Sequence, residues 1–209
     1  MSLSTLPQKT KKLLVSWRDF EMLANLISDV VSPPLVGISA AVVFISQTAP
    51  EPAQIWRWLA LTLPLLCLPP LGYVIWLVRH GELADIHMPD RRSRVKPLTM
   101  IMSWAGLCLW GLHYSNAPLE LILILGMVLG YIAILSIITL FWKISFHGAA
   151  ISAAASVGLV TGGLNSWSMV MLGLVPVVGW ARIYLRRHTT TQIIVGSLAG
   201  MSMGLLLLI

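Results

Sequence analysis

The chain has 209 residues, of which 57% are hydrophobic and only 11% are charged. Soluble domains carry about 25% charged residues, so this composition excludes an ordinary soluble protein and indicates a membrane protein. The 14 Lys and Arg outnumber the 8 Asp and Glu, and the cations flank apolar segments instead of covering a polar face. This placement argues against a nucleic-acid partner and favours membrane lipids or a phosphorylated lipid as the partner.

The predicted elements begin with a polar N-terminus over residues 1–29, in which 15–29 form an amphipathic helix on the membrane surface. Residues 30–209 are expected to form a single transmembrane domain. A spanning helix needs about 20 mostly apolar residues, and a series of segments approaches this length. They run over 30–48, 55–78, 97–114, 118–141, 147–164, 167–185 and 190–209. The sequence therefore predicts an all-α, polytopic transmembrane helix bundle of about six to seven spans.

Small residues predict how the last helices of this bundle pack. The segment 147–164 is rich in Ala, Gly and Ser, so we expect it to be buried among other helices. Gly196, Gly200 and Gly204 lie at four-residue spacing, which gives one helix face a smooth surface that allows close helix approach. Such small-residue faces also suit a homo-oligomer.

The distribution of positive charge predicts the orientation in the membrane. With seven spans, every Lys and Arg except Arg57 lies on one face, which the positive-inside rule makes cytoplasmic. We therefore expect an integral protein of the cell (inner) membrane with its charged motifs on the cytoplasmic face. If the segment 30–48 does not span, the N-terminus lies on the opposite side of the membrane. The positive charges are then split between the two faces, and the rule does not assign one orientation.

Three charged motifs meet at this face on the seven-span prediction. They are Arg94 with Lys96 and Pro97, then Lys143-Ile-Ser145-Phe-His147, and then Arg182-x5-His188-x3-Gln192. Clustered His, Arg and Lys at the ends of apolar helices indicate an anionic ligand. His80 and His113 have no such context and are predicted to lie at the membrane interface.

The third motif has the residue types that phosphoryl transfer requires. Arg182 can bind a phosphate through bidentate, charge-assisted hydrogen bonds. His188 and Gln192 are four residues apart on one helix face, so Gln192 can hold the imidazole in one orientation. His147 stands at the N-terminal end of a helix, where free N–H groups and the helix dipole favour an anion.

This arrangement resembles the type-2 phosphatidic acid phosphatase family of integral membrane enzymes, whose motifs are Lys-x6-Arg-Pro, Ser-Gly-His and Ser-Arg-x5-His-x3-Asp. The third motif matches in Arg182 and His188, and the second in Ser145 and His147. The first matches loosely, because two residues separate Arg94 from the proline. The resemblance covers roughly residues 85–209, the expected catalytic half. This chain departs from the family in having Ala181 for the Ser and Gln192 for the Asp of the third motif.

The resemblance implies a role for each matching residue. His188 is the nucleophile that forms a phosphohistidine, and His147 is the general acid that protonates the leaving oxygen. The residues expected to hold the phosphate are Arg182, Arg94, Lys143 and Ser145. The family uses no metal, and no other cofactor is expected.

The expected function is a metal-independent phosphatase acting on a lipid phosphate or diphosphate, such as phosphatidic acid, phosphatidylglycerol phosphate or a polyprenyl diphosphate. An alternative is a catalytically weak or inactive membrane protein of the same fold that binds lipid phosphate or acts as a membrane subunit. A prenyltransferase is a weaker alternative, because it needs two Asp-rich motifs to bind Mg²⁺. Asp85 and Asp90 form at most one.

Overall fold

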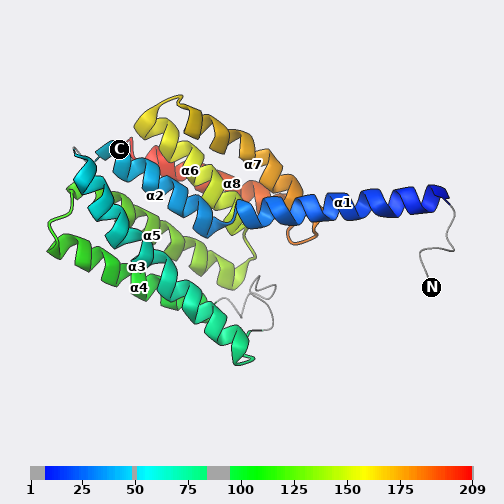
Figure 1. Ribbon diagram of the computed structural model, residues 1–209, viewed down its shortest axis with the longest axis horizontal. Coiled ribbons are helices and arrows are strands. Elements are labelled where there is room, and N and C mark those ends of the chain that lie inside the picture. The colour runs from blue at the N-terminus through cyan, green and yellow to red at the C-terminus, as the bar shows by residue number, and fades with distance from the viewer. Residues whose placement is uncertain (1–7, 49–50, 84–94, 209) are drawn as a thin grey trace. The chain divides into compact units, whose positions relative to one another are not determined.

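The computed structural model describes residues 8–48, 51–83 and 95–208, and every regular element within these ranges is an α-helix. The prediction of an all-α protein is therefore confirmed. Each of the predicted apolar segments coincides with one helix from α2 to α8 (Figure 1). The helices are α1 (Gln8–Val30), α2 (Pro33–Thr48), α3 (Pro52–Arg79), α4 (Val95–Tyr114), α5 (Leu119–Phe141), α6 (Phe146–Gly162), α7 (Ser166–Tyr184) and α8 (Thr190–Leu206).

Among the described residues, four helices are long and apolar enough to cross a membrane: α3, α4, α5 and α7. The stretches Arg18–Val30 and Pro33–Gln47 meet the same criterion when taken together, with a bend of 46° between them. The described residues thus hold four candidate spans, or five with this bent pair, as expected of an integral membrane protein. The helices α6 and α8 have 17 residues each, about 25 Å of helix against a hydrocarbon core of about 30 Å. The predicted six to seven spans are therefore not confirmed.

Proline marks one helix start and is tolerated inside another helix. The helix α2 begins at Pro33, because proline lacks the N–H that a first-turn residue leaves unused. The helix α3 continues through Pro64, Pro69 and Pro70. Interior prolines are tolerated in membrane helices, where neighbouring groups satisfy the freed carbonyl oxygens.

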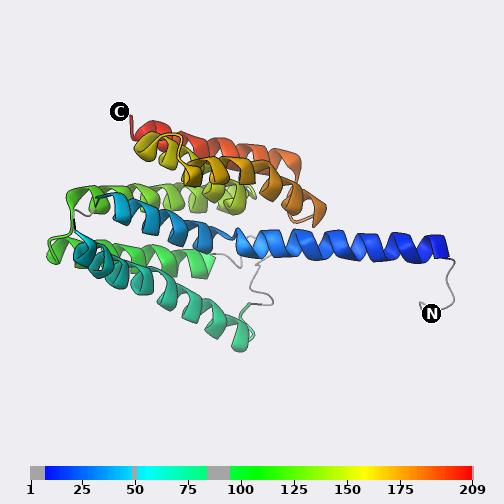
Figure 2. The same ribbon diagram turned by 45° about the horizontal axis from the view of Figure 1, so that its top comes forward.

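The chain divides into two compact units, of which the first consists of residues 1–35 and 145–209. In this unit α6 packs against both α7 and α8, and α1 packs against α7; the helices α6, α7 and α8 lie side by side in both views (Figure 2). The prediction that the Ala-, Gly- and Ser-rich segment is buried is confirmed. The buried residues of α6 are Gly148, Ala149, Ile151, Ser152, Ala153, Ala154, Ala155 and Gly158.

The glycine face of α8 sets how closely this helix approaches α6. A Cβ atom added to Gly196 would lie 2.6 Å from the Ser145 carbonyl oxygen, and one added to Gly204 would lie 2.7 Å from Ser156. Real Cβ atoms do not approach other atoms this closely, so the helices can make this contact only with glycine at these positions. The predicted tight packing is confirmed for α8 on α6. Pairing between copies of the chain stays a prediction.

The second unit consists of residues 36–144, with α4 packed against α3 and α5. Its core is apolar and joins residues from α2 to α5. The buried members are Ile45, Trp58, Leu59, Cys108, Leu112, Ala117, Leu121 and Leu125.

Candidate functional site

The turn between α7 and α8 positions His188 through main-chain hydrogen bonds. The N–H groups of Arg187 and Arg186 donate to the carbonyl oxygens of Arg182 and Ile183, at 3.0 and 2.9 Å. This pair of bonds defines a Schellman helix end. Arg186 has a φ of 52°, the left-handed conformation that the motif requires and that glycine usually provides. The N–H of His188 also donates to the Arg182 carbonyl oxygen, at 3.4 Å, so the five-residue gap is the length of this turn.

The first turn of α8 fixes the orientation of the Gln192 side chain. Thr189 Oγ1 accepts from the Gln192 N–H at 3.3 Å, and Gln192 Oε1 accepts from the Thr189 N–H at 3.2 Å, which together form a capping box. Because a main-chain N–H can only donate, the side-chain atom that faces it is the amide oxygen. The same Oε1 lies 3.1 Å from His188 Nδ1.

This contact determines the tautomer of His188. An amide oxygen only accepts hydrogen bonds, so the hydrogen between the two atoms belongs to Nδ1 of the imidazole. In the neutral ring the lone pair is then on Nε2. The contact between Gln192 and His188 that their four-residue spacing predicted is present, and it orients the ring with Nε2 on the side away from Gln192.

The start of α6 is held by Ser145 and tied to α8. Ser145 Oγ accepts from the Gly148 N–H at 3.2 Å, which makes Ser145 the N-cap of α6. The Ser145 N–H donates to the Gln192 carbonyl oxygen at 3.4 Å. His147, in the first turn of α6, is therefore placed near the beginning of α8. Ser145 is fully buried, and its contact with Gly148 gives it a structural role that the sequence analysis did not predict.

Ser28, near the end of α1, joins Arg182 to His147. The Arg182 guanidinium group donates from Nη1 to Ser28 Oγ at 2.7 Å. His147 Nε2 lies 3.1 Å from the Ser28 carbonyl oxygen, and because a carbonyl oxygen only accepts, Nε2 carries the hydrogen. Arg182 is 5% exposed and Ser28 is 1% exposed. One buried residue of α1 thus contacts two of the predicted site residues.

Asn25 forms a second link between α1 and the site. Its Oδ1 accepts from Arg187 Nη2 at 3.0 Å. The sequence analysis missed both Asn25 and Ser28. The sequence offered only a weak signal, the four-residue spacing of the small residues Ala24 and Ser28, both of which are buried in the structure.

Two arginines and two histidines lie close together in the site. Arg182, Arg187 and His188 lie close enough to His147 to act on it electrostatically. Arg182 and His188 are both buried, at 5% and 8% exposure. A buried guanidinium group such as that of Arg182 can hold an anion through charge-assisted hydrogen bonds. The structure thus brings His147, Arg182, His188 and Gln192 close together.

The roles of Arg94 and Lys143 as phosphate ligands stay predictions. Arg94 lies outside the described residues. Lys143 belongs to the unit of residues 36–144, and its contact with a phosphate stays a prediction.

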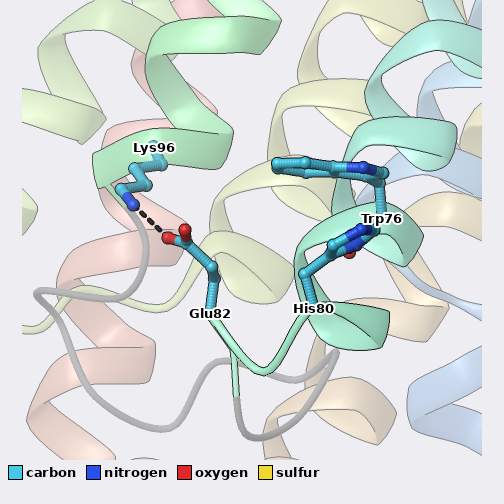
Figure 3. Close-up of polar contacts among 4 residues, drawn as sticks. All are labelled: Trp76, His80, Glu82 and Lys96. Atoms are coloured by element: carbon cyan, nitrogen blue, oxygen red, sulfur yellow. Dashed lines mark hydrogen bonds and ion pairs between the residues drawn. The ribbon is translucent and has the colours of Figure 1, made fainter.

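Lys96 of the first motif forms an ion pair with Glu82, after the end of α3 (Figure 3). The hydrogen bond and the positive charge of Lys96 lower the pKa of the Glu82 carboxyl group. Nearby, His80 Nδ1 lies 2.9 Å from the Trp76 carbonyl oxygen, and the two rings are in contact. Both Lys96 and Glu82 are exposed, so this cluster is a solvated contact between the ends of α3 and α4.

No family model, curated protein or solved structure matches this chain. Within the described ranges, no three His, Cys, Asp or Glu residues are grouped so that they could hold a metal ion.

Proposed function

We propose that the protein is an integral membrane phosphatase that hydrolyses a lipid phosphate or lipid diphosphate through a phosphohistidine intermediate. This is the function that the resemblance to the type-2 phosphatidic acid phosphatase family implies. The observation that supports it best is the grouping of buried Arg182 and His188 with partly buried His147, in which the Gln192 contact places the lone pair of the neutral His188 ring on Nε2. The substrate is phosphatidic acid, phosphatidylglycerol phosphate or a polyprenyl diphosphate.

In the first chemical step the Nε2 lone pair of His188 attacks the phosphorus atom. The bond from phosphorus to the leaving oxygen breaks, and this oxygen takes a proton from His147. Because the Nε2 hydrogen of His147 is hydrogen-bonded to Ser28, the transferred proton is the one on Nδ1 of the protonated ring. Arg182 balances the negative charge on the phosphoryl oxygens.

In the second step water attacks the phosphohistidine. His147, now neutral at Nδ1, accepts a proton from this water, the N–P bond breaks, and inorganic phosphate leaves. His188 returns to its neutral form with the hydrogen on Nδ1. In this proposal Arg94, Lys143 and Ser145 are further phosphate ligands.

The proposal includes a single polytopic domain of six to seven spans in the cell (inner) membrane, with the site on the cytoplasmic face. The helices α6 and α8 are at the short end of the range for a spanning helix, which is about 17 to 25 residues. Single cysteines introduced at Ser93 and at Glu120, after removal of Cys67 and Cys108, test the orientation by labelling in intact cells. Labelling of Ser93→Cys by a reagent that cannot cross the membrane would contradict a cytoplasmic site.

A second candidate function is binding of lipid phosphate without turnover, and the neutral side chain of Gln192 favours it. An amide oxygen can fix the His188 tautomer, but it cannot neutralise the positive ring as a carboxylate would. In a serine protease the comparable Asp-to-Asn change costs about 10⁴ in turnover. This candidate predicts lipid phosphate binding that Arg182→Ala abolishes, with no detectable hydrolysis.

The direct test is phosphate release by the purified, detergent-solubilised protein from the three substrates. We expect release from at least one of them, loss of release in His188→Ala, and unchanged release in the control His113→Ala. His113 is an exposed histidine at the end of α4. The proposal fails if no substrate yields phosphate, or if His188→Ala releases phosphate at the wild-type rate.

A further inference from the structure

Ser28 has a hydroxyl group whose hydrogen-bonding capacity is only partly used. Its Oγ accepts from Arg182 Nη1 at 2.7 Å, and it donates to no other described residue. A serine hydroxyl has one donor and two acceptor positions. Ser28 is 1% exposed, so solvent does not satisfy the donor, and a buried hydroxyl hydrogen without an acceptor is unfavourable.

The acceptor that would complete this contact is an anion bound to Arg182. The Ser28 hydroxyl is in direct contact with the guanidinium group, so an oxyanion held by that group lies next to the hydroxyl as well. A hydroxyl that accepts from a cation becomes a better donor, because hydrogen bonds in a chain polarise one another. The position is thus suited to phosphate, which offers several acceptor oxygens.

We propose that Ser28 is a further phosphate-binding residue, contributed by α1, whose hydroxyl donates to the phosphoryl group that Arg182 holds. The inference rests on the proposed function and deepens it, since it adds α1 to the substrate site. It also explains how the third motif works with Ala181, which has no hydroxyl to offer. Ser28 supplies a hydroxyl at Arg182 from a helix 154 positions away in the chain.

The two oxygen atoms of Ser28 have separate roles that substitution can distinguish. The carbonyl oxygen, which accepts from His147 Nε2, remains in any variant of the side chain. Ser28→Ala therefore removes the phosphate donor and keeps the contact with His147. Ser28→Thr keeps both groups and should restore binding. A matched control is Ser136→Ala in α5, where the hydroxyl donates to the Ile132 carbonyl oxygen within its own helix.

The experiment measures binding of orthovanadate to the full-length protein in detergent, together with phosphate release and thermal unfolding. Vanadate mimics phosphate and reports binding without turnover. Loss of one hydrogen bond to a charged ligand corresponds to roughly tenfold to hundredfold weaker binding. We expect this loss in Ser28→Ala, recovery in Ser28→Thr, and wild-type affinity in Ser136→Ala. If Ser28→Ala does not fold, Ser28→Cys, with its weak donor, should show the same loss.

The outcomes separate this inference from the proposed function. Wild-type vanadate affinity in folded Ser28→Ala, with unchanged KM and kcat, overturns the role of Ser28 and leaves the phosphatase intact. A lower melting temperature with unchanged vanadate affinity means that Ser28 is only structural, which also overturns it. If the wild-type protein releases no phosphate but its vanadate binding depends on Ser28, the phosphatase proposal fails and the binding role stands.

Discussion

The contact between Gln192 and His188 predicts the effect of restoring a carboxylate at this position. Gln192→Glu has the same shape, so the oxygen that lies 3.2 Å from the Thr189 N–H and 3.1 Å from His188 Nδ1 can remain in place. A negative charge in the first turn of a helix is also favourable, so we expect α8 to form normally. The change adds one negative charge directly beside the ring that becomes positive in the proposed phosphoryl transfer.

The distance sets the size of the expected effect. Two unit charges at 3.1 Å interact by about 5 kcal/mol at an effective dielectric constant of about 20, and partial exposure of this side chain reduces the net value. A hydrogen bond to a charged group contributes about 1.5–3 kcal/mol, against about 0.5–1.5 kcal/mol for a neutral pair. The difference of about 1–1.5 kcal/mol corresponds to a kcat about fivefold to tenfold higher.

Steady-state phosphate release over a range of pH checks this prediction. A carboxylate beside Nδ1 favours the protonated ring, which cannot attack phosphorus, so the acidic limb of kcat/KM should move to higher pH in Gln192→Glu. Gln192→Ala should lower kcat about twofold to tenfold, because it removes the hydrogen bond that holds His188 in the tautomer with the hydrogen on Nδ1. The control Gln54→Glu makes the same charge change in α3. An unchanged kcat and an unmoved acidic limb in Gln192→Glu would refute the role assigned to Gln192.

Three other predictions concern stability and can be checked by thermal unfolding. Gly200→Ala should cost about 1–3 kcal/mol, because its Cβ would overlap the main chain of α6. The control Gly130→Ala should show no such loss of stability, because a Cβ at this position meets nothing within 4 Å. Equal losses of stability in the two variants would contradict the close packing of α8 on α6. Arg186→Gly should raise the free energy of unfolding by about 0.5–1 kcal/mol, since it relieves the left-handed strain, and a lower melting temperature would count against the Schellman turn. The lowered pKa of Glu82 means that its ion pair with Lys96 stabilises the fold above the ordinary glutamate range. This contribution is lost as pH falls through the lowered pKa, and Glu82→Gln should remove that part of the pH dependence.

The sequence predicted the local features of the site because they depend on short spacings. Apolar length located the helices, and the four-residue spacing of His188 and Gln192 gave their contact, since these positions share one helix face. The gap from Arg182 to His188 is one Schellman turn. Each of these features involves residues close together in the chain.

The contribution of α1 could not be predicted in the same way. Ser28 and Arg182 are 154 positions apart, and helical periodicity does not indicate which helices pack together. The role of Ser145 was likewise ambiguous, because a serine before a helix is suited both to capping and to binding a phosphate. The number of spans depends on a few residues at the ends of α6 and α8, where apolar length alone is a weak guide.

The measurement that tests the central claim most directly is trapping of the phosphorylated enzyme. The purified protein is incubated with a lipid phosphate carrying a radioactive phosphoryl group, quenched in base to preserve phosphohistidine, and digested for peptide mapping. We predict label on the peptide that contains His188, no label in His188→Ala, and normal label in His113→Ala. Phosphate release without any labelled enzyme, or label on a residue other than His188, would contradict the account.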